Sequence, residues 1–262
     1  MSHPAVVLAL GGLDPLGQAG LAADLRAGAA LGVLVAPIAA ALTVQDLAGA
    51  RQEQGVDPSL LTAQLLAALR SLPIGAIKVG LLGGAVQAQT LAAVLDSVPG
   101  LPVVLDPVLG ATPGGSLAAD DFLPALRQTL LAKVTVLTPN LSEAEALLGA
   151  PLAPGTEGMV AAAQALRQMG AKAVLLKGGH LQGPYSSDYL CDEYGGMWLE
   201  APRLPTPNTR GTGCTLATLL AALLAQGQPL RAAAIGAKEA LGHLLRKGSA
   251  TTWPSGSGPV GV

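Results

Sequence analysis

Two kinds of apolar segment alternate along the chain. Short, nearly continuous apolar runs that end in Gly, Pro, Asp or Asn are typical of buried strands, whereas the longer segments between them repeat their apolar positions at helical spacing. The predicted strands lie at 5–10, 33–44, 76–82, 102–108, 134–140 and 173–179. The predicted helices lie at 20–32, 59–72, 85–98, 120–131, 141–149 and 157–169.

The pattern changes after residue 179. Segments 188–194 and 196–202 have the pattern of two short strands joined across Gly195-Gly196, and helices predicted at 213–226 and 230–247 close the chain. Repeated strand–helix units with apolar strands predict an α/β fold, in which a central, mostly parallel sheet is flanked by helices on both faces. Because no internal repeat or linker interrupts this pattern, we expect residues 1–262 to form a single domain.

Composition and charge narrow the function classes. The chain has 262 residues, half of them apolar, which is enough for the core of one large α/β domain. A net charge of −2, with 12% charged residues, provides no basic field for nucleic acid or anionic lipid, and 2% aromatic residues argue against base stacking. We therefore expect small-molecule partners rather than nucleic acid or a membrane, and we leave a homodimer open.

The cellular location is predicted from two apolar segments and from the two cysteines. The run at 5–10 has no basic region before it and ends in a glycine turn, which favours a first strand over a signal peptide. Segment 27–44 carries no charge and touches the lower length limit of a membrane span, but a glycine and a proline divide it, which favours a helix followed by a buried strand. Cys191 and Cys214 are too few for a disulfide framework and lack CxxC spacing. We expect a cytoplasmic protein.

Polar side chains follow three of the predicted strands, and in open α/β sheets ligands bind outside the carboxyl ends of the strands. Asp106 is a candidate, although a turn residue before a proline also explains it. Asn140, with Glu143 one turn later, suits either a ligand site or the N-cap of the next helix. Lys177 is harder to explain by packing, because a lysine that ends a buried strand before Gly178-Gly179 suits an anion better.

The glycine-rich segment after the first strand does not match the known phosphate loops. Gly12 and Gly17 have the spacing of a P-loop, but Gln18 and Ala19 stand where Lys and Ser or Thr belong. No GxGxxG follows the first strand either, so dinucleotide binding loses its main support.

The segment RGTGCT at 210–215 predicts an anion site at the start of a helix. Gly211 and Gly213 permit close backbone approach, and the free N–H groups and positive dipole end of the following helix suit a phosphate. The same field is expected to lower the pKa of the Cys214 thiol, which would make it a base or a nucleophile. A small buried residue at the helix start is the plain alternative. The nucleophile is the weaker hypothesis, because no protease-like His/Asn pair lies nearby in the sequence.

Five segments together resemble the hydroxymethylpyrimidine/phosphomethylpyrimidine kinases of thiamine synthesis, members of the ribokinase-like superfamily. They read LDPLGQAGLAADLRAGAALG, VVLDPV, TPNLSEAEALLG, LLKGGH and NTRGTGCT, and the resemblance extends from about residue 5 to GSGPV near the end. It implies a central, mostly parallel sheet flanked by helices. It also implies transfer of the ATP γ-phosphoryl group to the hydroxymethyl group of 4-amino-5-hydroxymethyl-2-methylpyrimidine, followed by a second transfer to the monophosphate.

The resemblance also implies roles for individual residues on the nucleotide side. Gly211, Thr212 and Gly213 match the anion hole, and Cys214 matches the residue that takes the proton of the attacking hydroxyl. Phosphoryl transfer depends mainly on positioning and charge neutralisation, which these groups suit. The residues implied to bind ATP are Lys177, Asn140, Glu143, Asp106 and Thr209, and the subset Asn140, Glu143 and Asp106 is implied to hold Mg²⁺.

On the acceptor side the resemblance implies that Asp24, Gln45 and Gly12 contact the pyrimidine. The Gln45 amide has a donor and an acceptor, which suits an aminopyrimidine edge, although a polar residue at a strand end is the alternative. The first loop departs from the family pattern at Leu13 and at Leu16-Gly17-Gln18, which predicts a more apolar and bulkier substrate pocket.

A second departure concerns charge. The family usually carries Lys-Ser-Gly in the loop after the aspartate, whereas GATPGGS at 110–116 has no cation. This puts the second phosphorylation in doubt, because a phosphorylated acceptor needs charge neutralised on both sides. Arg210, where the family usually has His, is a candidate replacement.

Three functions remain open from the sequence. The leading prediction is a pyrimidine kinase of thiamine synthesis, and the runner-up is a related pyridoxal or pyridoxine kinase. A non-catalytic pyrimidine-binding sensor gains support from the two altered loops, but it would not need the phosphate-binding set of Lys177, Asn140, Glu143 and Gly211 to Cys214.

Overall fold

The computed structural model describes residues 4–47, 49–109, 121–179, 181–254 and 256–261. Every strand named within these ranges belongs to one sheet with the order β3-β2-β1-β4-β5-β6-β7-β8-β9. The strands are β1 Val6–Leu13, β2 Leu34–Asp46, β3 Gly49–Gly55, β4 Ile74–Val79, β5 Val103–Leu105, β6 Val136–Leu137, β7 Ala173–Leu176, β8 Tyr185–Asp192 and β9 Gly195–Pro202. The central strands β2-β1-β4-β5-β6-β7 are parallel to one another. At the two edges of the sheet, β3 pairs antiparallel with β2, β8 pairs antiparallel with β7, and β9 pairs antiparallel with β8.

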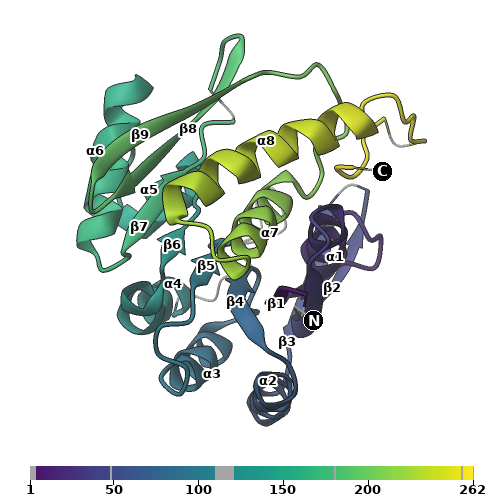
Figure 1. The fold of residues 1–262 in the computed structure, drawn as a ribbon, viewed down its shortest axis with the longest axis vertical. Helices are drawn as coiled ribbons and strands as arrows, with labels where there is room; N and C mark the ends of the chain where they lie inside the picture. The colour runs from purple at the N-terminus through teal and green to yellow at the C-terminus, as the bar shows by residue number, and fades with distance from the viewer. Residues whose placement is uncertain (1–3, 48, 110–120, 180, 255, 262) are drawn as a thin grey trace.

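Helices cover both faces of this sheet (Figure 1). The helices are α1 Gly20–Ala30, α2 Pro58–Ser71, α3 Ala85–Leu95, α4 Phe122–Ala125, α5 Leu141–Leu148, α6 Gly155–Gln168, α7 Thr212–Ala225 and α8 Leu230–Gly248. Helices α1, α7 and α8 pack on one face, and α2 to α6 pack on the other. The predicted fold, a mostly parallel sheet flanked by helices on both faces, is confirmed.

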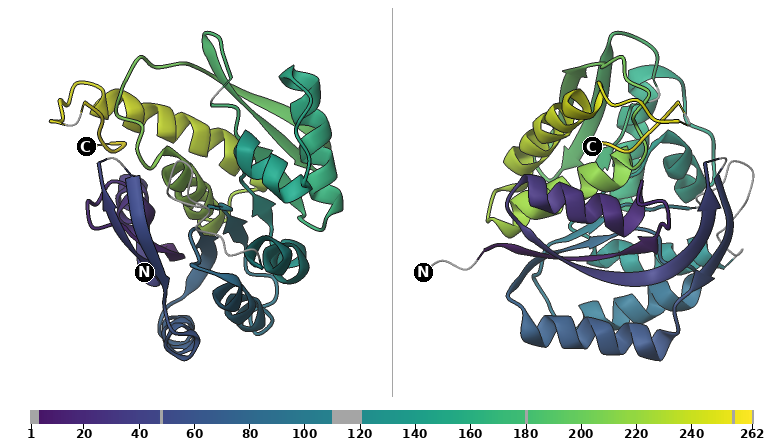
Figure 2. Two further views of the ribbon diagram at one scale, coloured as in Figure 1. Left: turned by 180° about the vertical axis from the view of Figure 1, so that it is seen from behind. Right: turned by 90° about the vertical axis from the view of Figure 1, so that its right-hand side faces the viewer.

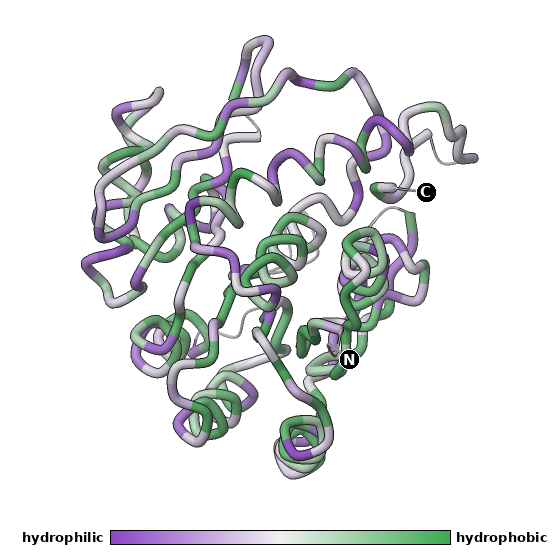
Figure 3. The backbone as a smooth tube through the Cα atoms, in the orientation of Figure 1, coloured by the Kyte–Doolittle hydropathy of each residue, from purple (hydrophilic) through white to green (hydrophobic). Residues whose placement is uncertain are grey.

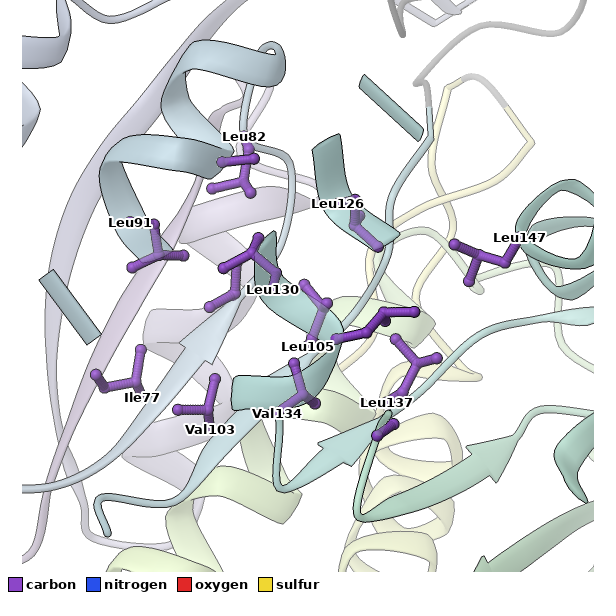
Figure 4. Packing of buried hydrophobic residues seen from close by; sticks show 14 of the residues in the cluster. Ile77, Leu82, Leu91, Val103, Leu105, Leu126, Leu130, Val134, Leu137 and Leu147 are labelled. Carbon is purple, nitrogen blue, oxygen red and sulfur yellow. The ribbon is translucent and has the colours of Figure 1, made fainter. Parts of the chain in front are cut away.

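Two apolar clusters, one on each face of the sheet, pack the helices against the strands. Figure 4 shows one of them, where side chains such as Ile77 and Leu105 from the sheet meet Leu91, Leu126 and Leu147 from the helices. In the other cluster α7 is buried along most of its length, because it lies between the sheet and α8. Polar and apolar stretches alternate along α8 (Figure 3), as expected of a helix with one face on the protein and one in solvent.

The sequence pattern missed the strand β3 and ended β2 too early. The prediction stopped at Val44, whereas β2 continues to Asp46 and β3 returns antiparallel beside it, with Gln45 paired to Ala50. The β3 sequence GARQEQG is mainly polar and mostly exposed at the sheet edge, so it has no apolar pattern to detect. Figure 2 shows this curved hairpin in its right-hand view.

Two other boundaries differ. The turn of the β8–β9 hairpin is formed by Glu193 and Tyr194 rather than by the two glycines, and Gly195 already pairs with Asp192. The helix predicted at 120–131 is short: after α4 the backbone continues as a π-helical turn, Leu126–Leu130, and a 3₁₀ turn, Leu131–Lys133.

The uncharged segment 27–44 forms the end of α1 and most of β2. Among the described residues, no helix combines the length and the apolar character needed to cross a membrane.

Candidate active site

The start of α7 lies where two groups of cavities meet. Gly211 precedes the helix with a φ of +78°, and a Cβ added there would lie 2.6 Å from the Gln18 carbonyl oxygen, so this left-handed, crowded position suits glycine. Thr212 donates its hydroxyl to the Thr209 carbonyl at 2.5 Å, which fixes the turn before the helix. The predicted helix start is confirmed, and the first-turn N–H groups face the site expected to bind an anion.

On one side of this turn lie a large cavity of about 480 Å³ and a smaller one of about 160 Å³. The large cavity is open between β8, β9, α8 and the start of α7. The two cavities share Gly179, Ser186, Thr212, Gly213, Lys238 and Leu241. Thr209 and Gly211 line the large cavity, and Asn140 and Lys177 line the small one, so the structure brings these predicted nucleotide-side residues together.

Lys177 is the centre of a partly buried charge cluster. Its Nζ lies 2.6 Å from Asp106 Oδ1 and 3.7 Å from Glu143 Oε2. Burial by itself lowers the pKa of Lys177, but the two carboxylates outweigh it and raise the pKa above its ordinary value, so the side chain stays charged. A Cβ on Gly213 would lie 3.2 Å from Lys177 Nζ, which shows how closely the start of α7 approaches this cation.

Asn140 and Glu143 cap the start of α5. The Glu143 N–H donates to Asn140 Oδ1 at 2.8 Å, and the Asn140 N–H donates to Glu143 Oε2 at 2.7 Å, which is a complete capping box. The helix-cap interpretation of Asn140 is therefore confirmed, and its nucleotide role stays a prediction. Burial raises the pKa of Glu143 to about 7, although Lys177 opposes that shift. Asp106, buried and paired with Lys177, is more than a turn residue.

Three residues without a role in the sequence-based predictions, Asp188, Lys238 and Arg203, hold the turn after Lys177. The Gly178 N–H donates to Asp188 Oδ1 at 2.9 Å, and Lys238 Nζ donates to Asp188 Oδ2 at 2.6 Å. Arg203 donates to four carbonyl groups of the same loop, those of Gly179, Leu181, Gly183 and Tyr185. No sequence signal pointed to these residues, because their partners come from distant segments.

A small hollow of about 80 Å³ lies on the other side of the α7 start. It is lined by Gly11, Gly12, Asp14, Ala19, Gly20, Thr43, Gln45, Lys78, Leu81, Val108 and Cys214. Three predicted residues, Gly12, Gln45 and Cys214, thus meet in one place, although they come from β1, β2 and α7. Cys214 and Gly213 are adjacent in sequence but face different cavities, so the first turn of α7 separates the two sides.

The first loop is organised by Asp14. Its carboxylate accepts the N–H groups of Leu16, Gln18 and Ala19, each at 2.8 Å. The two leucines that depart from the family pattern, Leu13 and Leu16, are exposed and do not line the hollow. The expected bulkier pocket therefore does not arise from these leucines in the structure.

Asp24 does not line the hollow either, because it is fully buried behind Lys78. Lys78 Nζ lies 2.8 Å from Asp24 Oδ1 and 2.9 Å from Oδ2, and Thr218 donates its hydroxyl to Oδ1 at 2.7 Å. Asp24 has no exposed surface in the structure, so the predicted pyrimidine contact stays a prediction. Lys78 itself had no role among the sequence-based predictions, although a lysine inside the apolar segment 76–82 is a detectable signal.

The expected depression of the Cys214 pKa is wrong. Burial raises the pKa of this thiol to about 11, and the carboxylates of Asp106 and Asp24 act in the same direction. Lys78 and the Gly20 N–H lower it, but they do not compensate. The helix start was expected to favour the thiolate, whereas loss of hydration at this position outweighs that field.

Two differences from the family's usual charged residues were noted in the sequence: Arg210 in place of a histidine, and the segment 110–116 without a lysine. Arg210 donates to the Leu47 carbonyl at 2.6 Å and to Ser257 Oγ at 3.3 Å, so it connects the start of α7 to the β2–β3 turn. The segment 110–116, which lacks the family's lysine, lies outside the described residues.

Comparisons with known proteins agree with this geometry. The family model described as "Phosphomethylpyrimidine kinase" matches residues 14–261. A hydroxymethylpyrimidine/phosphomethylpyrimidine kinase of Rhizobium meliloti is 37% identical over 258 residues, which cover 98% of this chain and 96% of that protein. The structure of an ADP complex of Bacillus subtilis pyridoxal kinase has a TM-score of 0.86 at 27% identity and covers 98% of this chain and 97% of its own.

A phosphomethylpyrimidine kinase structure from Clostridium difficile has a TM-score of 0.78 at 25% identity, and the match covers 91% of this chain and 98% of the other. These structural neighbours confirm the expected ribokinase-like fold. Because the family model spans nearly the whole chain and a full-length relative exceeds one third identity, the chain belongs to the phosphomethylpyrimidine kinase family.

Proposed function

We propose that this protein transfers the γ-phosphoryl group of ATP to the hydroxymethyl group of 4-amino-5-hydroxymethyl-2-methylpyrimidine in thiamine diphosphate synthesis. The observation that carries the proposal is the position of Gly211 to Cys214 between two cavities. The nucleotide-side cavities contain Lys177, and the acceptor-side hollow contains Gln45. The name of the Rhizobium relative and the ADP complex of the Bacillus neighbour support a nucleotide-dependent kinase.

On the nucleotide side, the residues supply charge and positioning. The Lys177 ammonium, held by Asp106, neutralises negative charge on the transferred phosphoryl group. The N–H groups at the start of α7 orient the same phosphoryl oxygens, in the manner of an anion hole. The Gly178-Gly179 turn, held by Asp188 and Arg203, leaves room for the phosphate chain.

The residues around Lys177 also fit a magnesium ion that is bound mainly through phosphate oxygens and water. Asp106 and Glu143 both lie beside Lys177 Nζ, and their carboxylate oxygens are of the type that Mg²⁺ prefers. Among the described residues, no group of three or more His, Cys, Asp or Glu side chains is arranged as a protein-only metal site. Asn140 would assist less directly, because its amide oxygen already accepts the Glu143 N–H. When bound, Mg²⁺ supplies further charge neutralisation at the phosphates.

On the acceptor side, Gln45 presents an amide to the pyrimidine edge and Gly12 gives the ring room against the first loop. Cys214 takes the proton of the attacking hydroxyl as the new O–P bond forms and the bond to the β-phosphate oxygen breaks. Since the thiol is protonated at neutral pH in the free protein, its thiolate is a minor form there.

Release of ADP with each candidate acceptor tests the proposal. Purified protein with ATP and Mg²⁺ is incubated with the hydroxymethylpyrimidine, its monophosphate or pyridoxal, and products are identified by mass spectrometry. We expect ADP release with the hydroxymethylpyrimidine. Turnover of pyridoxal without turnover of the pyrimidine would instead favour a pyridoxal kinase, an alternative supported by the fold similarity to the Bacillus enzyme. Binding of the pyrimidine without ADP release would favour a sensor.

A further inference from the structure

The ion pair between Lys78 and Asp24 is the most deeply buried charge pair in the described part of the chain, since both side chains have 0% exposure. Lys78 is the last residue but one of β4, and Asp24 lies on α1. A buried ion pair stabilises a fold little, because apolar residues of similar volume often serve as well or better. The fold therefore does not by itself account for a charged pair at this place.

The pair lies directly beside the reaction site. Lys78 lines the acceptor-side hollow together with Cys214. Thr218, which donates its hydroxyl to Asp24, follows Cys214 by one helical turn and so lies on the same face of α7. The Lys78–Asp24 pair is thus hydrogen-bonded to the helix that carries the thiol, one turn after Cys214.

Charges from four segments act on the Cys214 thiol. Lys78 approaches from β4 and Lys177 from the end of β7, while the carboxylates of Asp24 and Asp106 belong to α1 and the end of β5. The backbone N–H of Gly20, at the start of α1, also interacts with the sulfur. Lys177 is committed to Asp106 and the nucleotide side, which leaves Lys78 as the cation on the acceptor side.

We propose that Lys78 is a positioning residue that acts through Cys214: its ammonium, held in place by Asp24 and Thr218, stabilises the thiolate that accepts the hydroxyl proton. The inference rests on the proposed function of Cys214 as the proton acceptor. In the reaction, the proton moves from the acceptor hydroxyl to Sγ while the O–P bond forms and the bond to the β-phosphate oxygen breaks.

The electrostatic sign supports this role. Burial lowers the pKa of Lys78, but Asp24 and the other neighbours outweigh burial and raise it, so the ammonium stays charged. The pKa of Cys214 is about 11 even with Lys78 present. A base works best when its pKa is close to the working pH, so a nearby cation that lowers the thiol pKa increases the reactive fraction. Without Lys78 the thiolate would be scarcer still.

The test compares the protein with two double variants in which both charges are removed together, Asp24→Asn/Lys78→Met and Asp24→Asn/Lys78→Gln. Removing only one partner would leave a buried charge unpaired and endanger the fold. All variants carry Cys191→Ala, so that Cys214 is the one remaining cysteine of the chain. Carbamidomethylation by iodoacetamide is measured between pH 8 and 10, together with kcat and the thermal unfolding transition.

The expected result is a higher thiol pKa in the double variants. Loss of Lys78 raises the pKa of the Cys214 thiol, and loss of Asp24 offsets part of that rise. We therefore expect the thiol pKa to increase by about one unit, which makes alkylation roughly tenfold slower at each pH below the thiol pKa. The kcat at pH 8 should fall by about the same factor while the KM for ATP stays unchanged. The matched control is Asp192→Asn/Arg231→Gln, which removes an ion pair between β8 and α8 that lines neither the hollow nor the nucleotide-side cavities and should leave the alkylation rate as it is.

Each remaining outcome is decisive. An unchanged alkylation rate in a double variant that unfolds cooperatively would overturn the proposal. Failure of both double variants to fold would also overturn it, because the Lys78–Asp24 pair would then have a structural role. Alkylation requires no substrate, so it reports on Lys78 even if the unmodified protein releases no ADP with the pyrimidine. That second result would contradict the proposed function and not the link between Lys78 and Cys214.

Discussion

At the scale of single residues, Cys214 shows how burial overrides a local rule. A thiol at the start of a helix is expected to ionise easily, because the first-turn N–H groups and the helix dipole favour a negative charge. In the folded protein the same thiol is half-buried and lies near charged groups of α1, β4 and the end of β5, and loss of hydration raises its pKa to about 11. Its usefulness as a base therefore depends on the charges that tertiary structure places around it.

Substitution of Cys214 tests its role as the proton acceptor. Cys214→Ala and Cys214→Ser should each lose about 10² to 10⁴-fold in kcat, because neither side chain is a competent base, yet both should still bind MgATP. Cys214→Asp should recover part of the activity, since a carboxylate is ionised at ordinary pH.

The pH dependence separates these variants. Wild-type kcat should rise with pH across the neutral and alkaline range, because the thiolate forms only as the pH approaches about 11. The Cys214→Asp profile should be displaced toward lower pH. Full activity in the serine or alanine variant would instead make Cys214 a small packed residue.

Gln45 allows a second test at this scale. Gln45→Leu should leave the polar edge of the pyrimidine unpaired and raise the KM for the hydroxymethylpyrimidine by an amount worth about 1 to 3 kcal/mol. The KM for ATP should not change, because Gln45 lines only the acceptor-side hollow. Gln52→Leu on the exposed strand β3 is the matched control and should change neither constant. Equal effects on both substrates would remove Gln45 from the pyrimidine site.

At the scale of elements, the start of α5 both caps the helix and places the Glu143 carboxylate near Lys177. Asn140 and Glu143 satisfy each other's backbone N–H groups, so the helix begins at a fixed point. The same glutamate lies 3.7 Å from Lys177, and the helix start therefore places a carboxylate beside the lysine proposed to bind phosphate. Because burial raises the pKa of Glu143 to about 7, the element is sensitive to pH.

Glu143→Gln should remove this sensitivity while keeping the capping box. The pKa of Glu143 is higher in the folded protein than in the unfolded chain, so the folded state binds the extra proton and stability falls as the pH rises from about 4.5 to about 7. Above that range the wild type should have lost at most about 3 kcal/mol relative to acid pH. Urea unfolding at pH 5 and pH 8 measures the difference, which should be smaller in the variant. The same difference in both proteins would assign the pH effect to another group.

At the scale of the whole molecule, the first turn of α7 is a dividing wall between the proposed nucleotide side and the proposed acceptor side. Both faces of that wall are built from segments far apart in the chain, with Lys177 and Asp106 on one side and Gln45 and Lys78 on the other. The edge hairpin β2–β3 reaches this wall through Arg210, which donates to the Leu47 carbonyl. This contact engages the one arginine that was a candidate for replacing the missing loop lysine.

Segment 110–116 carries no cation and Arg210 is hydrogen-bonded to Leu47, so we predict that a phosphorylated acceptor is a poorer substrate than the hydroxymethylpyrimidine. A hydrogen bond to a charged group contributes about 1.5 to 3 kcal/mol, so kcat/KM for the monophosphate should lie about 10 to 10²-fold below that for the hydroxymethylpyrimidine. Steady-state kinetics with both acceptors measures the ratio. Equal values would show that another cation compensates, and Arg210→Ala would then identify or exclude this arginine.

Local sequence patterns were sufficient to predict most of the order of strands and helices, the mostly parallel sheet and the grouping of polar residues at its carboxyl edge. These features follow from periodicity and from residues close together in the chain, such as Gly211 before α7 and Lys177 after β7, so local patterns report them. The polar edge strand β3 escaped detection because it buries too little apolar surface to leave a pattern.

The environment of each polar group, in contrast, depends on how distant segments pack in the folded protein. The sequence could not show that Lys78 covers Asp24, that Asp188 and Lys238 hold the turn after Lys177, or that burial raises the pKa of Cys214, because each of these contacts joins segments distant in sequence. Hydration and charge at a site depend on which chain segments pack around it, and packing is a property of the folded molecule rather than of a local stretch of residues.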